Sequence, residues 1–205
     1  EAVGAARAPE ALPPPTAPYR PLPLLPPLLL AISAFALLRM PETLIILRSQ
    51  ELGVPIAVVP LLWAAVHVVK SSSSFAGGAW SDRLGARRTM WLGWVSYALL
   101  AGGMAAAQTS VQAWALFLAL GLVAGLTESP ERALVAQLAG GRQGSGFGVY
   151  HGATGLAALV GGVALGALYQ QGSAALAFGV SAAGGAVLAL GWPLLAVARE
   201  RRGRS

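Results

Sequence analysis

Residues 56–80 read IAVVPLLWAAVHVVKSSSSFAGGAW, a stretch in which Lys70 is the only charged side chain. A helix needs about 20 mainly apolar residues to cross the hydrocarbon core of a bilayer, and this stretch is long enough. It lacks the alternation of apolar and polar residues that a transmembrane strand shows. The stretch therefore predicts a transmembrane α-helix with one ionisable group near its middle.

Five further apolar stretches, separated by short polar breaks, extend this pattern over most of the chain. Residues 1–21 are rich in alanine and proline, and we interpret them as a cytoplasmic linker, with a signal peptide as the alternative. Residues 199–205 form a basic tail. The predicted fold class is an all-α membrane protein with six transmembrane helices. The predicted spans are residues 22–47, 56–80, 89–107, 111–128, 147–169 and 175–198.

The composition also indicates that lipid is the solvent of this chain. Hydrophobic residues make up 56% of the sequence and charged residues only 11%, whereas soluble domains carry about 25% charged residues. The absence of cysteine excludes disulfides, thiolate metal sites and a cysteine nucleophile. Because there are also only two histidines, we expect neither a metal centre nor a cofactor.

The positions of the basic residues predict the topology of the chain. Of its 14 lysines and arginines, eleven lie in segments on one side of the predicted membrane. Arg48 lies on the opposite side, while Arg39 and Lys70 lie within predicted spans. Basic residues are concentrated on the cytoplasmic side of membrane proteins, so both termini are expected in the cytoplasm. This bias accounts for the net charge of +6 without a nucleic-acid partner.

The most distinctive local motif is GAWSDRLGARR at residues 78–88, between the second and third predicted spans. The motif resembles the signature loop of the major facilitator superfamily. In that loop a glycine is followed by three residues, Asp-Arg, one residue, a second glycine and a basic cluster. Ala86 stands where that loop usually has a further basic residue. A plain basic cytoplasmic loop is the alternative interpretation. We expect close helix approach at Gly78, a tight turn at Gly85, and a fixed charge at Asp82. The predicted conformational gating loop comprises Gly78, Asp82, Arg83, Gly85, Arg87 and Arg88.

Residues 47–53, 128–138 and 144–150 also resemble stretches of bacterial members of this superfamily. The resemblance implies that the chain from about residue 22 onward is the C-terminal six-helix half of a twelve-helix transporter. It further implies a bacterial inner membrane location, a missing N-terminal half as partner, and alternating access of a central cavity to the two sides. The gating loop would then help to hold the outward-facing state.

Polar residues inside the predicted spans are candidates for contact with substrate or protons, because charge inside a bilayer is costly. In the second span a polar stripe follows helical spacing, and it faces either a wet cavity or another helix. In the first span Arg39 and Glu42 are three residues apart, so Glu42 either takes part in transport or neutralises Arg39. His151 in the fifth span is either a packing residue or part of a proton relay. The stripe consists of His67, Lys70, Ser71 and Ser74.

Two further patterns predict contacts between or within helices. Gly121 and Gly125 lie four residues apart, a spacing that lets two helices approach closely in lipid. Residues 129–138 resemble a short cytoplasmic helix, started by a capping Ser129 and a first-turn proline. Glu128 and Arg132 are four residues apart and are predicted to form a cytoplasmic latch.

The predicted function is secondary active transport of a small solute, coupled to protons, by a permease that works in uptake or efflux. A scaffold or sensor that transports nothing is the first alternative. An intramembrane enzyme is the second, but the chain contains neither Gly-x-Ser-x-Gly nor His-Glu-x-x-His. Six further spans upstream with a second Asp-Arg loop would favour the transporter over both alternatives.

Overall fold

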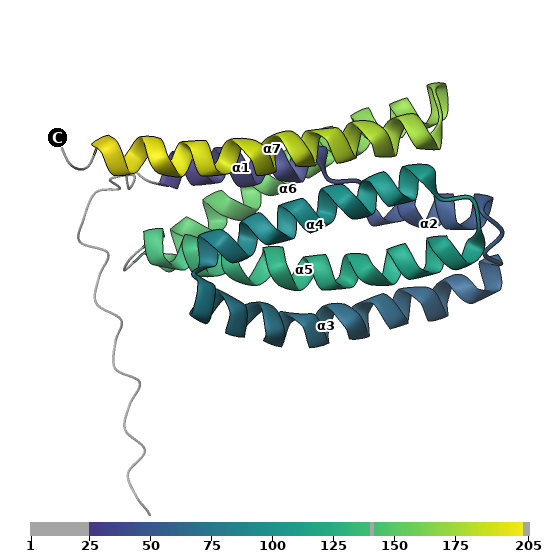
Figure 1. The fold of residues 1–205 in the computed structure, drawn as a ribbon, viewed down its shortest axis with the longest axis horizontal. Helices are drawn as coiled ribbons and strands as arrows, with labels where there is room; N and C mark the ends of the chain where they lie inside the picture. Colours follow the sequence, from purple (N-terminus) through teal and green to yellow (C-terminus); the bar gives the residue numbers. More distant parts are fainter. Residues whose placement is uncertain (1–24, 140–141, 203–205) are drawn as a thin grey trace, which may run out of the picture.

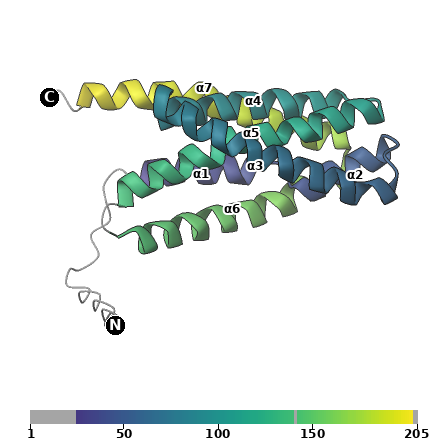
Figure 2. The same cartoon turned by 90° about the horizontal axis from the view of Figure 1, so that it is seen from below.

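The computed structural model describes residues 25–139 and 142–202, which form long helices and contain no strand. The predicted linker at residues 1–21 lies outside these residues. The long helices run side by side as a bundle (Figures 1 and 2). The prediction of an all-α fold is therefore confirmed. The helices are α1 (Leu25–Leu38), α2 (Glu42–Glu51), the short 3-10 helix η1 (Ile56–Val58), α3 (Val59–Leu84), α4 (Ala86–Ala106), α5 (Ser110–Ala139), α6 (Gln143–Gln171) and α7 (Ala174–Arg202).

Five helical segments in the described part of the chain are long and apolar enough to cross a membrane. Among the long helices described, α4 is the one that is not apolar enough to be counted with these segments. It begins next to Arg87 and Arg88 and contains tryptophan, tyrosine and serine among its apolar residues. Its 21 residues are nevertheless long enough to cross a bilayer, and α4 packs against both α5 and α7. The five segments are Pro27–Glu51, Ile56–Leu84, Ser110–Gln137, Gln143–Gln171 and Ala174–Trp192.

The first predicted span is not one continuous helix. The α1 helix ends at Leu38 and α2 begins at Glu42, so the span predicted over residues 22–47 is interrupted, although Pro27–Glu51 as a whole is long and apolar enough to cross a membrane. Pro41 directly precedes α2, with φ −59° and ψ 139°. Proline cannot donate a backbone hydrogen bond, and it disfavours helical geometry in the residue before it. The helix therefore stops before Pro41 and restarts after it.

The fourth predicted span continues much further than the sequence indicated. The α5 helix runs without interruption from Ser110 to Ala139 and includes Pro130. The separate cytoplasmic helix predicted over residues 129–138 is therefore wrong. Pro130 is among the most completely buried residues of the chain. As a result, residues 128–132 occupy a transmembrane helix instead of a connection between two helices.

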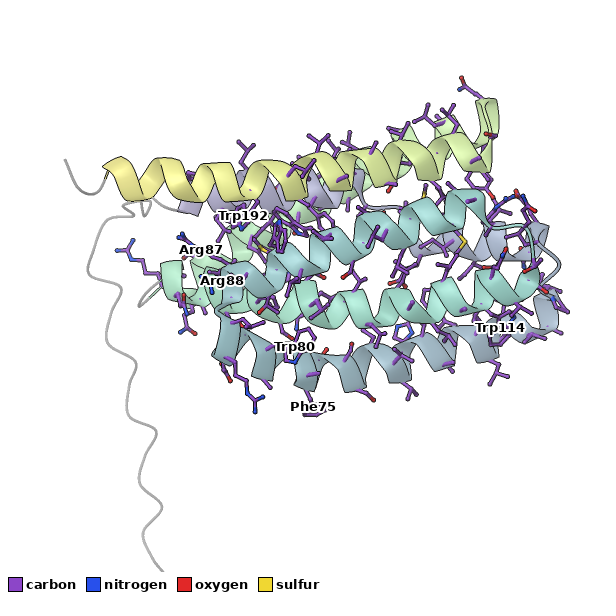
Figure 3. All side chains as sticks on the ribbon, viewed as in Figure 1. Phe75, Trp80, Arg87, Arg88, Trp114 and Trp192 are labelled. Atoms are coloured by element: carbon purple, nitrogen blue, oxygen red, sulfur yellow. The ribbon has the colours of Figure 1, made fainter. Side chains whose placement is uncertain are left out.

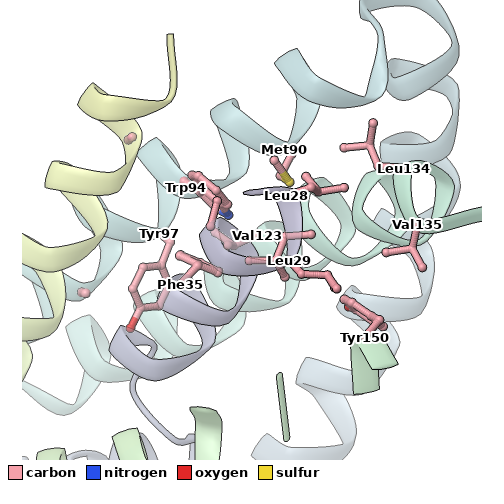
Figure 4. Packing of buried hydrophobic residues seen from close by; sticks show 14 residues of the cluster. Leu28, Leu29, Phe35, Met90, Trp94, Tyr97, Val123, Leu134, Val135 and Tyr150 are labelled. Atoms are coloured by element: carbon pink, nitrogen blue, oxygen red, sulfur yellow. The ribbon is translucent and has the colours of Figure 1, made fainter. Parts of the chain in front are cut away.

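Aromatic side chains from several helices form the core near the α3–α4 turn. Phe35 of α1 stacks on Trp94 of α4 with ring centroids 5.3 Å apart, and it meets the edge of Tyr97 at 5.2 Å (Figure 4). Trp91 Nε1 donates a hydrogen bond to the Ala189 carbonyl of α7 at 2.8 Å. These contacts tie α4 to α1 and α7 around one buried cluster.

Glycines bring α3 and α5 into direct backbone contact. A Cβ added at Gly77 would overlap the carbonyl of Gly125, and one added at Gly125 would overlap the Ser73 carbonyl. Ser73 Oγ also donates a hydrogen bond to the Gly121 carbonyl at 2.7 Å. The predicted close contact at Gly121 and Gly125 is confirmed. The predicted helix approach at Gly78 is wrong, because a Cβ there would meet nothing within 4 Å in the described chain.

The outer surface of the bundle is apolar along its length. Phe75 is 81% exposed on the outer face of α3, and Val163 of α6 is 69% exposed. Arg87 and Arg88 lie at the end of the bundle that holds the α3–α4 turn, whereas Trp114 lies toward the opposite end (Figure 3). Exposed apolar side chains between two polar ends are what a bilayer requires of a protein surface.

Candidate functional site

A polar cavity of about 300 Å³ lies between α1, α5 and α6. Its α1 wall is largely apolar, whereas its α5 wall is charged and its α6 wall carries aromatic and hydroxyl groups. Most of the lining residues come from the half of the bundle that contains the α3–α4 turn. The cavity is lined by Ile32, Phe35, Ala36, Arg39, Glu128, Glu131, Arg132, Tyr150, His151, Thr154, Gly155 and Ala158.

Glu128 binds two cations from two helices. Lys70 Nζ of α3 lies 2.7 Å from Glu128 Oε1, and Arg132 Nη2 lies 3.4 Å from Glu128 Oε2. The pairing of Glu128 with Arg132 is therefore confirmed. The additional bond to Lys70 was not predicted, and it joins a residue of the polar stripe to the latch. Lys70 lies midway along the Ile56–Leu84 candidate span, so the cluster extends to the middle of this helical segment.

Glu131 is a site residue that the sequence analysis missed. Its side chain is buried, with 6% of the residue exposed, and Tyr150 Oη of α6 donates a hydrogen bond to Glu131 Oε2 at 3.1 Å. The prediction placed this residue in a cytoplasmic helix, where a carboxylate costs little. Glu131 is three residues from Glu128, so both carboxylates lie on one face of α5. This spacing points to a shared site only once α5 is known to continue through residue 131.

Arg39 and Glu42 do not form the predicted ion pair in the described structure. Three residues of separation bring two side chains together only within a helix, and the break at residues 39–41 removes that geometry. Both residues are exposed. Arg39 lines the large cavity and also a cleft of about 40 Å³ that Glu42, Lys70 and Glu128 share. Arg39 and Glu128 therefore connect the cavity to the cleft.

The other residues of the polar stripe lie outside the described cavity and cleft. His67 is exposed, and its Nδ1 lies 2.9 Å from the Trp63 carbonyl oxygen of its own helix. Ser74 Oγ donates to the Lys70 carbonyl at 2.9 Å, and Ser71 is exposed. His151 does line the cavity, with its ring centroid 4.8 Å from that of Tyr150. Lys70 is therefore the member of the stripe that contacts the charged cluster.

Two hydroxyl groups from other helices form hydrogen bonds with the backbone N–H and carbonyl groups at the α1–α2 break. The Met40 N–H donates to Tyr97 Oη at 2.6 Å, and Ser181 Oγ donates to the Leu38 carbonyl at 2.6 Å. The two hydroxyl oxygens are 2.5 Å apart. Since the Ser181 proton is directed to Leu38, the Tyr97 hydroxyl donates to Ser181. Tyr97 and Ser181 thus hold the break open at the depth of the cavity.

Replacing Tyr97 with phenylalanine is expected to lower the free energy of unfolding by about 1–3 kcal/mol, because it leaves buried backbone and hydroxyl groups unpaired. Thermal unfolding of the purified protein in detergent measures this change. Ser33→Ala is a suitable control, since the buried Ser33 hydroxyl has no hydrogen-bond partner among the described residues. Equal stability of the Tyr97→Phe variant and the parent chain would contradict the role of Tyr97.

The predicted gating loop forms a tight turn between α3 and α4. Gly85 has φ +87°, a conformation that favours glycine, and its N–H donates to the Ser81 carbonyl at 3.0 Å. The predicted tight turn at Gly85 is confirmed. Four charged residues around the turn are exposed, and none of them takes part in an ion pair of the described structure. These residues are Asp82, Arg83, Arg87 and Arg88.

Two comparisons with known proteins bear on this site. The family model described as Major Facilitator Superfamily matches residues 23–205, which is nearly the whole chain. A comparison with curated proteins gives no match. The matched family consists of membrane transporters, and the six-span arrangement agrees with one half of its fold. The chain belongs to the Major Facilitator Superfamily.

Proposed function

We propose that this chain carries a small solute across the membrane by alternating access, together with a second six-helix half. The supporting observation is the polar cavity between α1, α5 and α6, which contains charged residues from within the membrane spans. Charged residues at such positions are costly and mark pathways for substrates and ions. Rocking of the two halves would expose the cavity to each side of the membrane in turn.

Proton coupling is the second part of this proposal. Glu131 lies on the cavity wall inside the α5 span and accepts a hydrogen bond from Tyr150. His151 follows Tyr150 along the same wall. Buried glutamates and histidines that line membrane cavities act as proton relays in pumps and transporters. Glu131 is therefore the carboxylate that we assign to proton binding, in place of Glu42.

The α3–α4 turn is assigned to contact with the second half. Asp82, Arg83, Arg87 and Arg88 are exposed and make no ion pair in the described structure. They are free to pair with charged groups of a partner surface. The arginine distribution supports placing this turn, and both termini, in the cytoplasm. The resemblance to bacterial members of the family favours a bacterial inner membrane as the location.

Solute-driven proton movement in liposomes tests this function. The full-length protein is reconstituted with a pH-sensitive dye inside the liposomes, and candidate solutes are added outside. We expect one solute class to change the internal pH, and we expect Glu131→Gln to abolish that change while solute binding persists. Glu51→Gln is the matched control, because Glu51 is an exposed carboxylate that pairs with Arg48 at 3.1 Å outside the cavity.

Two results would contradict the proposal. If Glu131→Gln leaves the proton movement unchanged, Glu131 is not the coupling residue. If the protein moves neither solute nor protons although it is folded in the liposomes, the scaffold or sensor alternative is favoured over transport.

A further inference from the structure

Arg39 occupies an unusual position for a charged residue. It lies midway between the ends of the Pro27–Glu51 span, directly after α1 ends. Its side chain lines both the cavity and the adjoining cleft. A guanidinium keeps its charge under all physiological conditions, so at this depth it requires either water or an anionic partner.

The other cations of the site already have such a partner. Lys70 and Arg132 both bind the carboxylate of Glu128. Glu131 accepts its hydrogen bond from Tyr150 and not from an arginine. Within the described residues, no carboxylate lies within ion-pair distance of Arg39. Arg39 acts electrostatically on Glu131 but makes no ion pair in the described structure, so its guanidinium is available to an anionic ligand.

The surroundings of Arg39 combine this free charge with an apolar wall. Ile32, Phe35 and Ala36 of α1 line the cavity within about two helical turns of Arg39. Across from them, α6 contributes Gly155 and Ala158. A guanidinium presents two parallel N–H groups that match the two oxygens of a carboxylate. An apolar surface next to that group suits the hydrocarbon part of a ligand.

We infer that the cavity binds small organic acids, with the carboxylate on Arg39 and the apolar body against Ile32, Phe35 and Ala158. This inference rests on the proposed function, since it names the class of solute that the transporter carries. Lys70 is less suited to this role, because it already pairs with Glu128. A solute of this class supplies the direct ion-pair partner that Arg39 lacks in the described structure.

Thermal unfolding of the full-length protein with three probes of similar size tests the inference. Benzoate, benzamide and benzylamine share a ring and differ in the charge of the attached group. At a concentration about tenfold above its dissociation constant, benzoate is expected to raise the melting temperature by about 1–3 °C. Benzamide and benzylamine at the same ionic strength are expected to leave the melting temperature unchanged.

Three variants assign the effect to Arg39. Arg39→Gln is expected to abolish the shift, and Arg39→Lys to reduce it, because an ammonium cannot bind a carboxylate with two parallel bonds. Arg48→Gln removes an arginine that lies outside the cavity and pairs with Glu51, and it is expected to retain the full shift. Should Arg39→Gln fail to fold, the reduced shift of Arg39→Lys against the full shift of Arg48→Gln still decides the question.

The results separate this inference from the proposed function. No shift with benzoate, or an equal shift with benzamide, would overturn the inference even if the protein transports another solute. A shift that Arg39→Gln retains would overturn it as well. Binding of benzoate through Arg39 without any solute or proton movement would support the inference and contradict only the proposed transport.

Discussion

Replacing Gly77 with alanine is expected to lower the free energy of unfolding by about 1–3 kcal/mol, the range for overpacking a tight contact. The added methyl group would overlap the backbone carbonyl of Gly125 on α5. A backbone carbonyl cannot move aside as the end of a flexible side chain can. The two helices must therefore separate, which also weakens the hydrogen bond from Ser73 to the Gly121 carbonyl.

Gly78→Ala is the matched control for this prediction. It adds the same methyl group to the next residue of α3, where nothing in the described chain lies within 4 Å. Alanine also favours helix over glycine by about 1 kcal/mol, so Gly78→Ala is expected to be neutral or stabilising. Thermal unfolding of both variants in the same detergent provides the comparison. Equal effects of the two substitutions would contradict the close α3–α5 contact.

Replacing Glu128 with glutamine is expected to reduce transport about tenfold and to destabilise the protein by about 1–3 kcal/mol. The substitution removes the carboxylate that binds Lys70 and Arg132. Removing one partner of a buried ion pair costs about 3–5 kcal/mol, and the cost is lower here because the side chains of Lys70 and Glu128 remain 30% and 23% exposed. A barrier raised by about 1.4 kcal/mol slows a step tenfold.

A double-mutant cycle with Lys70→Met distinguishes the ion pair from a general effect of either substitution. If the pair is real, the double variant is expected to be more stable than the sum of the two single changes predicts, by about 0.5–3 kcal/mol. Strict additivity in thermal unfolding would contradict the pairing. Transport is expected to stay low in the double variant, because removing both charges keeps the net charge of the site but does not restore the charges that a moving solute meets.

The contrast between Pro41 and Pro130 shows how far the sequence can predict this fold. Both prolines lie within apolar stretches, yet α1 and α2 separate at Pro41 whereas α5 continues through Pro130. The apolar run alone predicts a span in both places. The break at Pro41 depends on hydroxyl groups of Tyr97 and Ser181, which come from helices distant in the sequence. Such tertiary partners cannot be inferred from local patterns.

The candidate site shows the same limit. Lys70 and Glu128 could each be recognised as notable from the sequence, one within a span and one beside Arg132. Their contact depends on the close approach of α3 and α5 at glycine residues. Because Glu131 was assigned to a connection, its burial could not be anticipated. A charged residue becomes informative only when its depth in the membrane is known.

The most direct test of the account is the accessibility of the cavity from the two sides of the membrane. The chain has no cysteine, so Ala158→Cys places one thiol of this chain on the cavity wall, and Leu159→Cys places one on a neighbouring exposed position outside it. Each variant of the full-length protein is treated with a membrane-impermeant thiol reagent in right-side-out and inside-out vesicles. Alternating access predicts that Ala158→Cys is labelled in both orientations and protected by benzoate, whereas the extent to which Leu159→Cys is labelled does not change with benzoate. Labelling of Ala158→Cys from one side only, under every solute condition, would contradict the account.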